Sequence, residues 1–338
     1  MDRLRGIASV VAVLVLGLVS GAAGQAAPAG EVVMAWHVTI SPSWFDPSTA
    51  PPQITPFGMM YAIHDALVRP LPGQKVGNSL AESWKESPDG RRYEFKLRRD
   101  LKFHNGDPVT ADDVKWSFER YKGSGSKLLQ ERVRQVDVVD PLTVRFHLKE
   151  PWPDFMTFYG TSATGAAWIV PKKYVEKVGD DGFKKAPIGA GPYKVVSFTP
   201  GVELVMEAFE GYWRKTPSVK RLVFRSMPEE TTRAAALKKG DVDIAYLLTG
   251  PVADDIRKTP GMKLVGAKPP GVFWIDLPDQ WDPKSPWHDL RVRRAALHAI
   301  DRTAINKAET LAWRPECRWL RGPEIVKPHT SQVCNLLK

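Results

Sequence analysis

Alternating apolar and polar residues in the middle of the chain predict β-strands that bury one face. Tyr93, Phe95 and Leu97 are separated by charged residues, which is the two-residue period of a half-buried strand. The same alternation recurs at 144–148, after an Asp-Pro turn, and predicts a hairpin with 136–139. Further strands are predicted at 32–40, 193–198, 202–209, 219–225 and 241–246.

Apolar residues at helical spacing predict helices between these strands. Residues 57–69 predict a helix with one apolar face, which Pro70 ends. Thr110 and Asp113 form a capping box, so a second helix is expected over 111–121.

Two more helices are predicted in the second half of the chain. One begins around Pro228 and ends at Gly240, the usual positions of these two residues. The other begins after Asp289 and covers 290–306. Its residues expected to face inward are Ala295, Leu297, Ile300 and Ile305. Strands and helices mix throughout, so the fold class is α/β, in the mixed α+β sense.

Composition and charge are those of an ordinary globular protein. The 338 residues are 43% hydrophobic and 25% charged, a length that predicts about two domains. No internal stretch reaches the ~18 apolar residues of a membrane span. The formal net charge is +10, of which 27–311 carry +6 with both signs interspersed. Without a Lys/Arg stripe that could follow phosphates, we expect no nucleic-acid partner.

The first 26 residues have the pattern of a secretory signal peptide. Basic Arg3 and Arg5 precede an apolar run at 7–19 and a group of small residues. That run is too short to span ~30 Å of hydrocarbon, and Gly21 stands where a lipoprotein would need cysteine. We therefore expect a periplasmic protein that is not embedded in the membrane once the signal peptide is cleaved.

Sequence motifs for catalysis, metal binding or phosphate binding are missing. The chain has no HExxH, paired CxxC, GxSxG or GxxxxGK[ST] pattern, and no two of its seven histidines have helical i, i+4 spacing. The Gly-Ala-Gly run at 189–191 lacks the third glycine of a dinucleotide fingerprint and predicts a tight backbone turn. Acid pairs at 112–113 and 229–230 lie at predicted helix starts, where they complement the helix dipole. We expect no enzyme, cofactor or metal, although a metal site assembled only by the fold stays open.

One continuous run, 80–117, is more specific than these patterns. It contains LAESW (80–84), SPDG (87–90), YEFKLR (93–98), FHNG (103–106), PVTADDV (108–114) and WS (116–117). Four later segments agree in order: PIGAGPY (187–193), GYW (211–213), RAAALKKGDVDI (233–244) and LRVRRAALHAIDR (290–302). Together they resemble the extracellular solute-binding proteins of family 5, the peptide and nickel receptors of ABC importers.

This resemblance implies a fold of the type II periplasmic-binding-protein kind. A first-lobe sheet domain would comprise 31–75 and 186–275, with an inserted subdomain at 76–185 and the start of a second lobe at 276–311. The implied function is to bind a small solute, most often an oligopeptide or dipeptide, by cleft closure and to present it to membrane permease subunits. Nickel complexes, opines and oligosaccharides stay open as solutes.

Residues 312–338 depart from the family pattern, and they contain both cysteines, Cys317 and Cys334. These two can pair in an oxidising compartment, but the sequence does not fix the geometry of a disulfide. We expect a C-terminally truncated receptor that lacks most of its second lobe, through a frameshift or a degraded gene. A misassembled sequence end and a genuine short variant are the alternatives. A truncated receptor would have half of its cleft, and its transport function would be in doubt.

The position of residues in the implied fold gives candidates for solute contact. They are Trp36, Ser43, Trp44, Tyr61 and Trp274. The chain has 12 tryptophans, and such side chains suit a ligand cleft as well as a core. Two alternatives to a receptor are an extracytoplasmic interaction or chaperone-like protein that uses the exposed half-cleft, and a secreted hydrolase. The hydrolase would need a nucleophile and base for which the sequence has no local signature.

Overall fold

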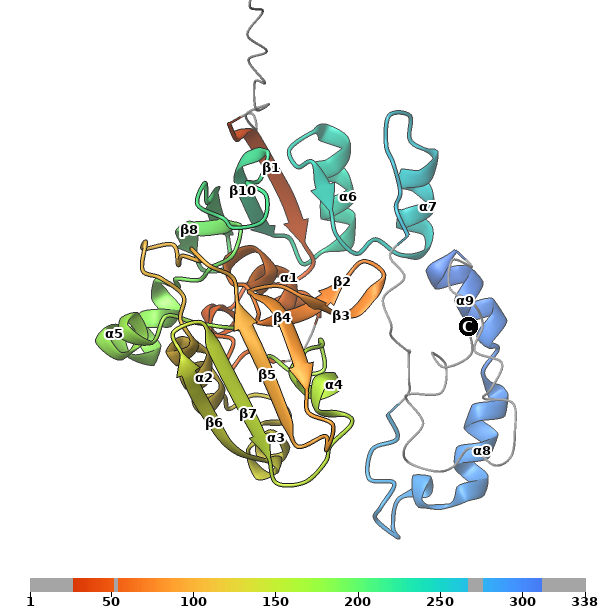
Figure 1. Ribbon diagram of the computed structural model, residues 1–338. Helices are drawn as coiled ribbons and strands as arrows, with labels where there is room; N and C mark the ends of the chain where they lie inside the picture. The colour runs from red at the N-terminus through yellow and green to blue at the C-terminus, as the bar shows by residue number, and fades with distance from the viewer. Residues whose placement is uncertain (1–26, 52–53, 267–275, 312–338) are drawn as a thin grey trace, which may run out of the picture.

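A five-stranded sheet and a four-stranded sheet organise the computed structural model, which describes residues 27–51, 54–266 and 276–311 (Figure 1). The five-stranded sheet has the order β11-β1-β10-β9-β8. Its strands are β1 (Ala29–Trp36), β8 (Tyr193–Thr199), β9 (Glu203–Ala208), β10 (Val219–Ser226) and β11 (Ile244–Ala245). β1 is parallel to β10 and β11, whereas β9 is antiparallel to β8 and β10. The three parallel strands therefore end at the same edge of the sheet.

Alternate residues of β1 face two different cores. Val33 and Ala35 pack with α6 (Glu230–Lys239) in one core. Trp36 packs on the opposite face, with α1 (Ile54–Ile63) and the 3-10 helix η1 (Pro42–Phe45). The two-residue period of the strand thus places one helix on each face of the sheet.

The four-stranded sheet is antiparallel and has the order β4-β5-β7-β6. Its strands are β4 (Ala81–Glu86), β5 (Arg92–Leu97), β6 (Val133–Asp140) and β7 (Thr143–Leu148). The alternation of Tyr93, Phe95 and Leu97 correctly predicted a buried strand face, since all three are buried. The hairpin predicted from 136–139 and 144–148 is confirmed, and so is the mixed α/β class.

Helices cover this sheet and connect it to the rest of the chain. α2 (Ala111–Glu119) begins at the predicted capping box, in which Thr110 and Asp113 each accept the other's backbone N–H. The others are α3 (Ser126–Arg132), α4 (Phe155–Tyr159) and α5 (Lys172–Lys185), the last being kinked at Gly179.

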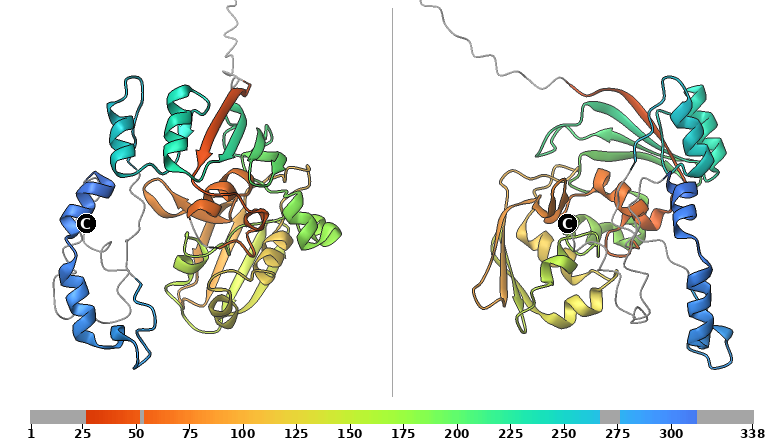
Figure 2. Two further views of the ribbon diagram at one scale, coloured as in Figure 1. Left: turned by 180° about the vertical axis from the view of Figure 1, so that it is seen from behind. Right: turned by 90° about the vertical axis from the view of Figure 1, so that its right-hand side faces the viewer.

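α1 lies between the two sheets (Figure 2). Met59 and Ile63 belong to the core under the five-stranded sheet, whereas Phe57 and Met60 belong to the core of the four-stranded sheet. The sequence predicted a single apolar face, which is wrong. A helix packed on both sides is apolar around its circumference, so apolar spacing alone could not give its orientation.

The predicted extent of this helix, 57–69, is also wrong. The helix ends at Ile63, and the chain continues into a hairpin of β2 (Val68–Leu71) and β3 (Gln74–Asn78). The polar residues that follow the helix, His64 and Asp65, are fully buried, so no exposed turn marks its end.

Asp65 joins two distant segments, at 79 and at 212–213, through its buried carboxylate. It accepts hydrogen bonds from Ser79 Oγ at 2.5 Å, Trp213 Nε1 at 2.9 Å and Tyr212 Oη at 3.1 Å. Arg69 Nη1 lies 3.4 Å from the same carboxylate. The charge is thus surrounded by donors, as a buried carboxylate requires.

The segment 187–191 packs directly against the end of α1. A Cβ on Gly189 would lie 2.1 Å from the Ile63 carbonyl oxygen, and one on Gly191 would lie 2.6 Å from the Ala62 carbonyl oxygen. The glycines are therefore needed for close backbone approach. His104 holds the segment from the other side. Its Nε2 donates to the Gly191 carbonyl oxygen at 3.0 Å, and its Nδ1 accepts the Gly189 N–H at 3.3 Å.

Two predicted elements in the second half of the chain, a helix and a strand, form with shifted bounds, and a helix that was not predicted follows them. α6 begins at Glu230, two residues after Pro228, and Gly240 ends it in the left-handed conformation with φ 84°. The short strand β11 occupies two residues of the predicted 241–246. α7 (Gly250–Lys258) follows it.

The predicted helix 290–306 is two helices, α8 (Leu290–Ala299) and α9 (Arg302–Thr310), preceded by the 3-10 helix η2 (Pro286–His288). Asp289 caps α8 as predicted, accepting the Arg291 N–H. Asp301 then accepts the Ala304 N–H at 2.9 Å and caps α9, so a second start signal interrupts the helix.

The expected inward face of this segment is also wrong. Leu297 and Ile305 expose 46% and 51% of their surface, and Trp281 exposes 78%. Figures 1 and 2 show α8 and α9 lying apart from both sheets. Three exposed apolar side chains within 281–305 favour association of this chain with other molecules.

Residues 1–26, 312–338 and Trp274 lie outside the described residues, and with them the predicted signal peptide, both cysteines and the departing tail. Among the residues described, no helix is long and apolar enough to cross a membrane.

We expect the exposed apolar side chains of α8 and α9 to drive self-association. Replacing Leu297→Gln together with Ile305→Gln should raise the monomer fraction in size-exclusion chromatography with light scattering, because it removes apolar surface from water. The matched control is Val138→Thr with Val139→Thr on β6, where the exposed fractions are 40% and 46%. A wild-type chain that is already monodisperse, or an equal gain in both variants, would contradict this role of the helices.

Candidate functional site

The carboxyl ends of β1, β10 and β11 meet at one edge of the five-stranded sheet. Trp36 is paired with Ser226, and the Met227 N–H donates to the Trp36 carbonyl oxygen at 2.8 Å. On the other side, the Tyr246 N–H donates to the Ala35 carbonyl oxygen at 3.0 Å. This edge of parallel strands is where open α/β sheets bind ligands. We call Trp36, His37, Arg233, Tyr246 and Leu247 the strand-end cluster.

Aromatic rings form the body of the strand-end cluster. The Trp36 ring centroid lies 5.0 Å from those of Phe224 and Tyr246, and the His37 ring lies 5.3 Å from Tyr246. Trp36 is 4% exposed. A Cβ on Gly58 would lie 2.8 Å from its Cη2, so this glycine lets α1 approach the indole.

Three buried nitrogens of the cluster have no hydrogen-bond partner among the described residues. They are Trp36 Nε1, which is only a donor, His37 Nδ1 and Arg233 Nε. Burial, and then the positive charge of Arg233, lower the pKa of His37. Its imidazole is therefore neutral at pH 7 and can donate through one nitrogen and accept through the other. Unpartnered buried polar atoms are costly, and a bound polar ligand would remove that cost.

Arg233 supplies a buried positive charge beneath these rings. It is 2% exposed and donates to the carbonyl oxygens of Met227, Pro228 and Leu247 at 2.8, 2.7 and 2.7 Å. These bonds tie together the loops that leave β10 and β11. Leu247 has φ 58°, an uncommon backbone conformation for a branched residue. Its side chain is 49% exposed, which makes it the apolar group of the cluster most open to solvent.

η1 follows β1 and begins at a serine cap. Ser41 Oγ accepts the Ser43 N–H and lies 2.8 Å from Ser43 Oγ. Ser43 is exposed, whereas Trp44 packs against the core that contains Trp36. η1 therefore exposes the Ser43 hydroxyl while the neighbouring Trp44 packs against the core that contains Trp36.

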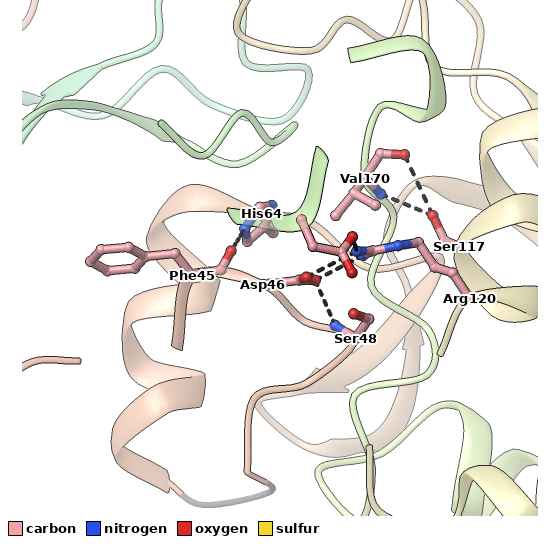
Figure 3. Close-up of polar contacts among 8 residues, drawn as sticks. Phe45, Asp46, Ser48, His64, Ser117, Arg120 and Val170 are labelled. Carbon is pink, nitrogen blue, oxygen red and sulfur yellow. Dashed lines mark hydrogen bonds and ion pairs between the residues drawn. The ribbon is translucent and has the colours of Figure 1, made fainter. Parts of the chain in front are cut away.

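A buried ion pair holds the end of η1 in place (Figure 3). Arg120 Nη1 and Nη2 donate to the two Asp46 carboxylate oxygens at 2.8 and 2.9 Å, and Nη2 also reaches Asp180 at 2.7 Å. The Asp46 carboxylate accepts the Ser48 N–H as well, at 2.9 Å. Burial alone would raise the pKa of Asp46, but the hydrogen bonds and charge of Arg120 hold it below its usual value. The loop after β1 is thus tied to α2.

His64 supports the same loop from α1. Its Nε2 lies 2.9 Å from the Phe45 carbonyl oxygen, as Figure 3 shows. Burial lowers the pKa of His64 to about 4, so the imidazole stays neutral at pH 7.

Of the residues expected to contact solute, the structure places Trp36, Ser43 and Trp44 around one core. Tyr61 lies elsewhere, with its ring 4.8 Å from that of Trp168 and against the core of the four-stranded sheet. Trp274 lies outside the described residues. Their roles in solute contact stay predictions.

Sequence reasoning missed His37, Arg233 and Tyr246 as members of this site. His37 and Tyr246 were indicated indirectly, because both lie near the carboxyl end of a predicted strand, at 32–40 and 241–246. The chain-distant pairing of β1 with β11, which joins them, is not visible in local patterns. Arg233 opens the segment RAAALKKGDVDI (233–244), which carries the family resemblance, but no local pattern assigned this arginine to a site.

The site has the chemistry of binding. It offers aromatic surface, an N–H donor, a neutral imidazole and a buried positive charge. Within the described ranges, no group of three or more His, Cys, Asp or Glu residues could hold a metal ion.

Comparison with known proteins gives a family and several relatives. The family model for bacterial extracellular solute-binding proteins, family 5, matches residues 75–309. The glutathione-binding protein GsiB of Salmonella choleraesuis is 30% identical over 264 residues, which are 76% of this chain and 50% of that protein. The chain thus spans about half the length of the curated relatives it matches.

Solved structures agree with this family. The binding protein AgaA from A. tumefacien R10, in complex with agropinic acid, is 32% identical with a TM-score of 0.62, over 68% of this chain and 46% of that one. DppA from Helicobacter pylori, in complex with the peptide STSA, is 25% identical with a TM-score of 0.60, over 68% of this chain and 49% of that one.

We expect the Asp46–Arg120 ion pair to be essential for stability. Asp46→Asn leaves a buried guanidinium without its bidentate partner, so the free energy of unfolding should fall by about 3–5 kcal/mol. Glu150→Gln is the control, because it removes the partner of Arg132 in an ion pair whose side chains are 38% and 63% exposed. It should cost about 1 kcal/mol or less. Urea unfolding would compare them, and equal losses would show that burial does not strengthen the Asp46 pair.

We also expect stability to fall on mild acidification. Burial lowers the pKa of both His64 and His104 to about 4. Between pH 6.5 and 4.5 the unfolded chain therefore binds protons that the folded chain does not, so the free energy of unfolding decreases, by up to about 3 kcal/mol for His64. Carboxylates whose pKa is lowered in the folded chain change the free energy of unfolding mainly below this pH window. Burial raises the pKa of Asp113, so the folded chain binds this proton more readily than the unfolded chain, which opposes the effect.

Melting curves at these two pH values provide the measurement. His104→Gln keeps a donor for the Gly191 carbonyl and should flatten the pH dependence, while His298→Gln on exposed α8 should leave it unchanged. A melting temperature that is the same at pH 6.5 and 4.5 would rule out the buried neutral histidines.

Proposed function

Because this chain belongs to the bacterial extracellular solute-binding proteins of family 5, we propose that it is the periplasmic solute-binding component of an ABC importer. The proposed solute is a short peptide, which it binds without chemical change and presents to the membrane permease. The glutathione-binding and peptide-bound relatives support this solute class. The sequence pattern of a signal peptide supports export.

The observation that carries the proposal is that two of the three unpartnered nitrogens in the strand-end cluster belong to aromatic side chains at the sheet edge. Trp36 Nε1 and His37 Nδ1 lie buried beyond the carboxyl ends of parallel strands. A peptide carries a carbonyl or carboxylate oxygen for the indole N–H and an N–H group or oxygen for the imidazole. The exposed hydroxyl of Ser43 and the side chain of Leu247 would border the bound solute.

The same proposal includes a division of the chain. Residues 31–75 with 186–275 would form the sheet domain of the first lobe, 76–185 the inserted subdomain and 276–311 the start of a second lobe. The five-stranded sheet is drawn from both parts of the first range, and the four-stranded sheet lies within the second. Solute would be enclosed when a second lobe closes over the strand-end cluster.

Trp36→Phe tests the role of the indole N–H. It keeps an aromatic ring in the core and removes one donor, so affinity for glutathione or pooled di- and tripeptides should fall about three- to tenfold. Isothermal titration and intrinsic fluorescence of the full chain give the affinity. The control is Trp84→Phe, which removes a partly buried indole from the four-stranded sheet and should leave solute affinity unchanged.

Two outcomes would count against the proposal. Absence of any response to the pooled peptides would exclude the peptide solute class. Equal affinities of the two tryptophan variants would remove Trp36 from the solute site.

A further inference from the structure

A basic hollow lies at the end of the four-stranded sheet that is farthest from the five-stranded sheet (Figure 1). Its volume is about 400 Å³, and it is formed where the turn between β4 and β5 meets the end of β7 and the start of β6. The charged side chains that line it are Arg91, Arg92, Arg134, Lys149 and Asp89. The strand-end cluster is on the other sheet, so this hollow is separate from the proposed solute site.

The cations of the hollow differ from those on the rest of the same sheet face. Lys85 and Arg145 both pair with Glu94, at 2.8 and 2.6 Å, and Lys96 pairs with Glu82 at 2.9 Å. These ion pairs neutralise the middle of the sheet.

Arg91, Arg92, Arg134 and Lys149 form no ion pair with a carboxylate anywhere in the part of the chain that the structure describes. The one carboxylate in the lining, Asp89, already accepts the Ser87 hydroxyl and the Arg91 N–H. The hollow therefore has a formal charge of +3 from its lining.

The backbone holds these charges close together. The Leu148 N–H donates to the Arg91 carbonyl oxygen at 2.8 Å, and the Ser87 N–H donates to that of Arg92 at 2.8 Å. Arg92 is paired with His147 across β5 and β7. Gly90, with φ 64°, closes the turn that brings β5 back along β4.

Arg134 joins the group from β6, the edge strand next to β7. It lies at an irregularity in the pairing of β6 with β7, between Val133 and Gln135, where an extra residue is left out of the ladder. The paired strands thus hold the backbone of the four cations close together before any ligand arrives.

We propose that this hollow binds a phosphate group. Guanidinium groups match the oxygens of phosphate in paired hydrogen bonds, and a lysine adds a mobile charge. Three arginines and a lysine without carboxylate partners would together neutralise a doubly charged phosphate. The group can come from a free phosphate compound or from the headgroup of an anionic lipid.

Inorganic pyrophosphate and lipid vesicles are the two probes. The full chain is titrated with pyrophosphate by calorimetry, and its binding to phosphatidylglycerol vesicles is compared with binding to phosphatidylcholine vesicles by sedimentation. Arg92→Gln with Arg134→Gln removes two exposed cations of the hollow. Lys85→Gln with Lys96→Gln is the matched control, with the same change of charge on the same sheet face.

The proposal predicts binding of at least one probe and at least a tenfold loss of affinity in the Arg92/Arg134 variant, against less than a twofold change in the control. Binding of pyrophosphate alone indicates a free phosphate compound, and binding that requires phosphatidylglycerol indicates a lipid headgroup. Equal losses in both variants would show general charge attraction and overturn the proposal, as would a wild-type chain that binds neither probe. Unchanged melting temperatures and peptide response would show that the variants remain folded and that the solute site is independent.

Discussion

The buried turn that ends α1 is the constraint on which the arrangement of both sheets depends. Ile63, His64 and Asp65 each contact segments that are distant in the chain. The Ile63 carbonyl receives the Gly191 N–H at 3.0 Å, His64 reaches the Phe45 carbonyl, and Asp65 collects donors from 79 and 212–213. Two of the three side chains are polar and fully buried, so each must keep its partners or leave an unsatisfied group. A shift of this turn would therefore break contacts to both sheets at once.

The geometry of the strand-end cluster follows from that turn. With α1 fixed, Gly58 allows the helix to approach Trp36, and the indole closes the core beneath the sheet edge. The loop after β1 is then held by Asp46 and Arg120 rather than by regular pairing. Loops fixed by buried charges can carry exposed groups such as the Ser43 hydroxyl at a defined position, which is what a binding site needs. The unpartnered nitrogens are thus held on a rigid frame.

Local signals were enough to predict most strands and several helix ends, and long-range contacts account for the errors. Thr110 and Asp113 bond each other within one helical turn, and Tyr93 to Leu97 alternate within one strand, so both were correctly predicted. The end of α1 depends on partners of His64 and Asp65 that are distant in the chain. Asp301 is a residue type that caps helices well, but it was overlooked because apolar residues continue on both sides of it. The site was predicted in part: Trp36 ends a recognisable strand, whereas Arg233 and Tyr246 reach it through the parallel pairing of β1 with β10 and β11.

The unpartnered aromatic nitrogens of the strand-end cluster and the cations of the basic hollow obey different electrostatics, and this argues for different ligands. Trp36 Nε1 and His37 Nδ1 are buried and belong to uncharged groups, so their contribution depends on hydrogen-bond geometry in a medium of low dielectric constant and responds little to salt. The cations of the basic hollow are exposed and act through charge, so their attraction reaches further but is screened within about 10 Å at 0.1 M salt. A solute selected at the first location must fit in shape and hydrogen bonding. A ligand held at the second would need only several negative charges close together.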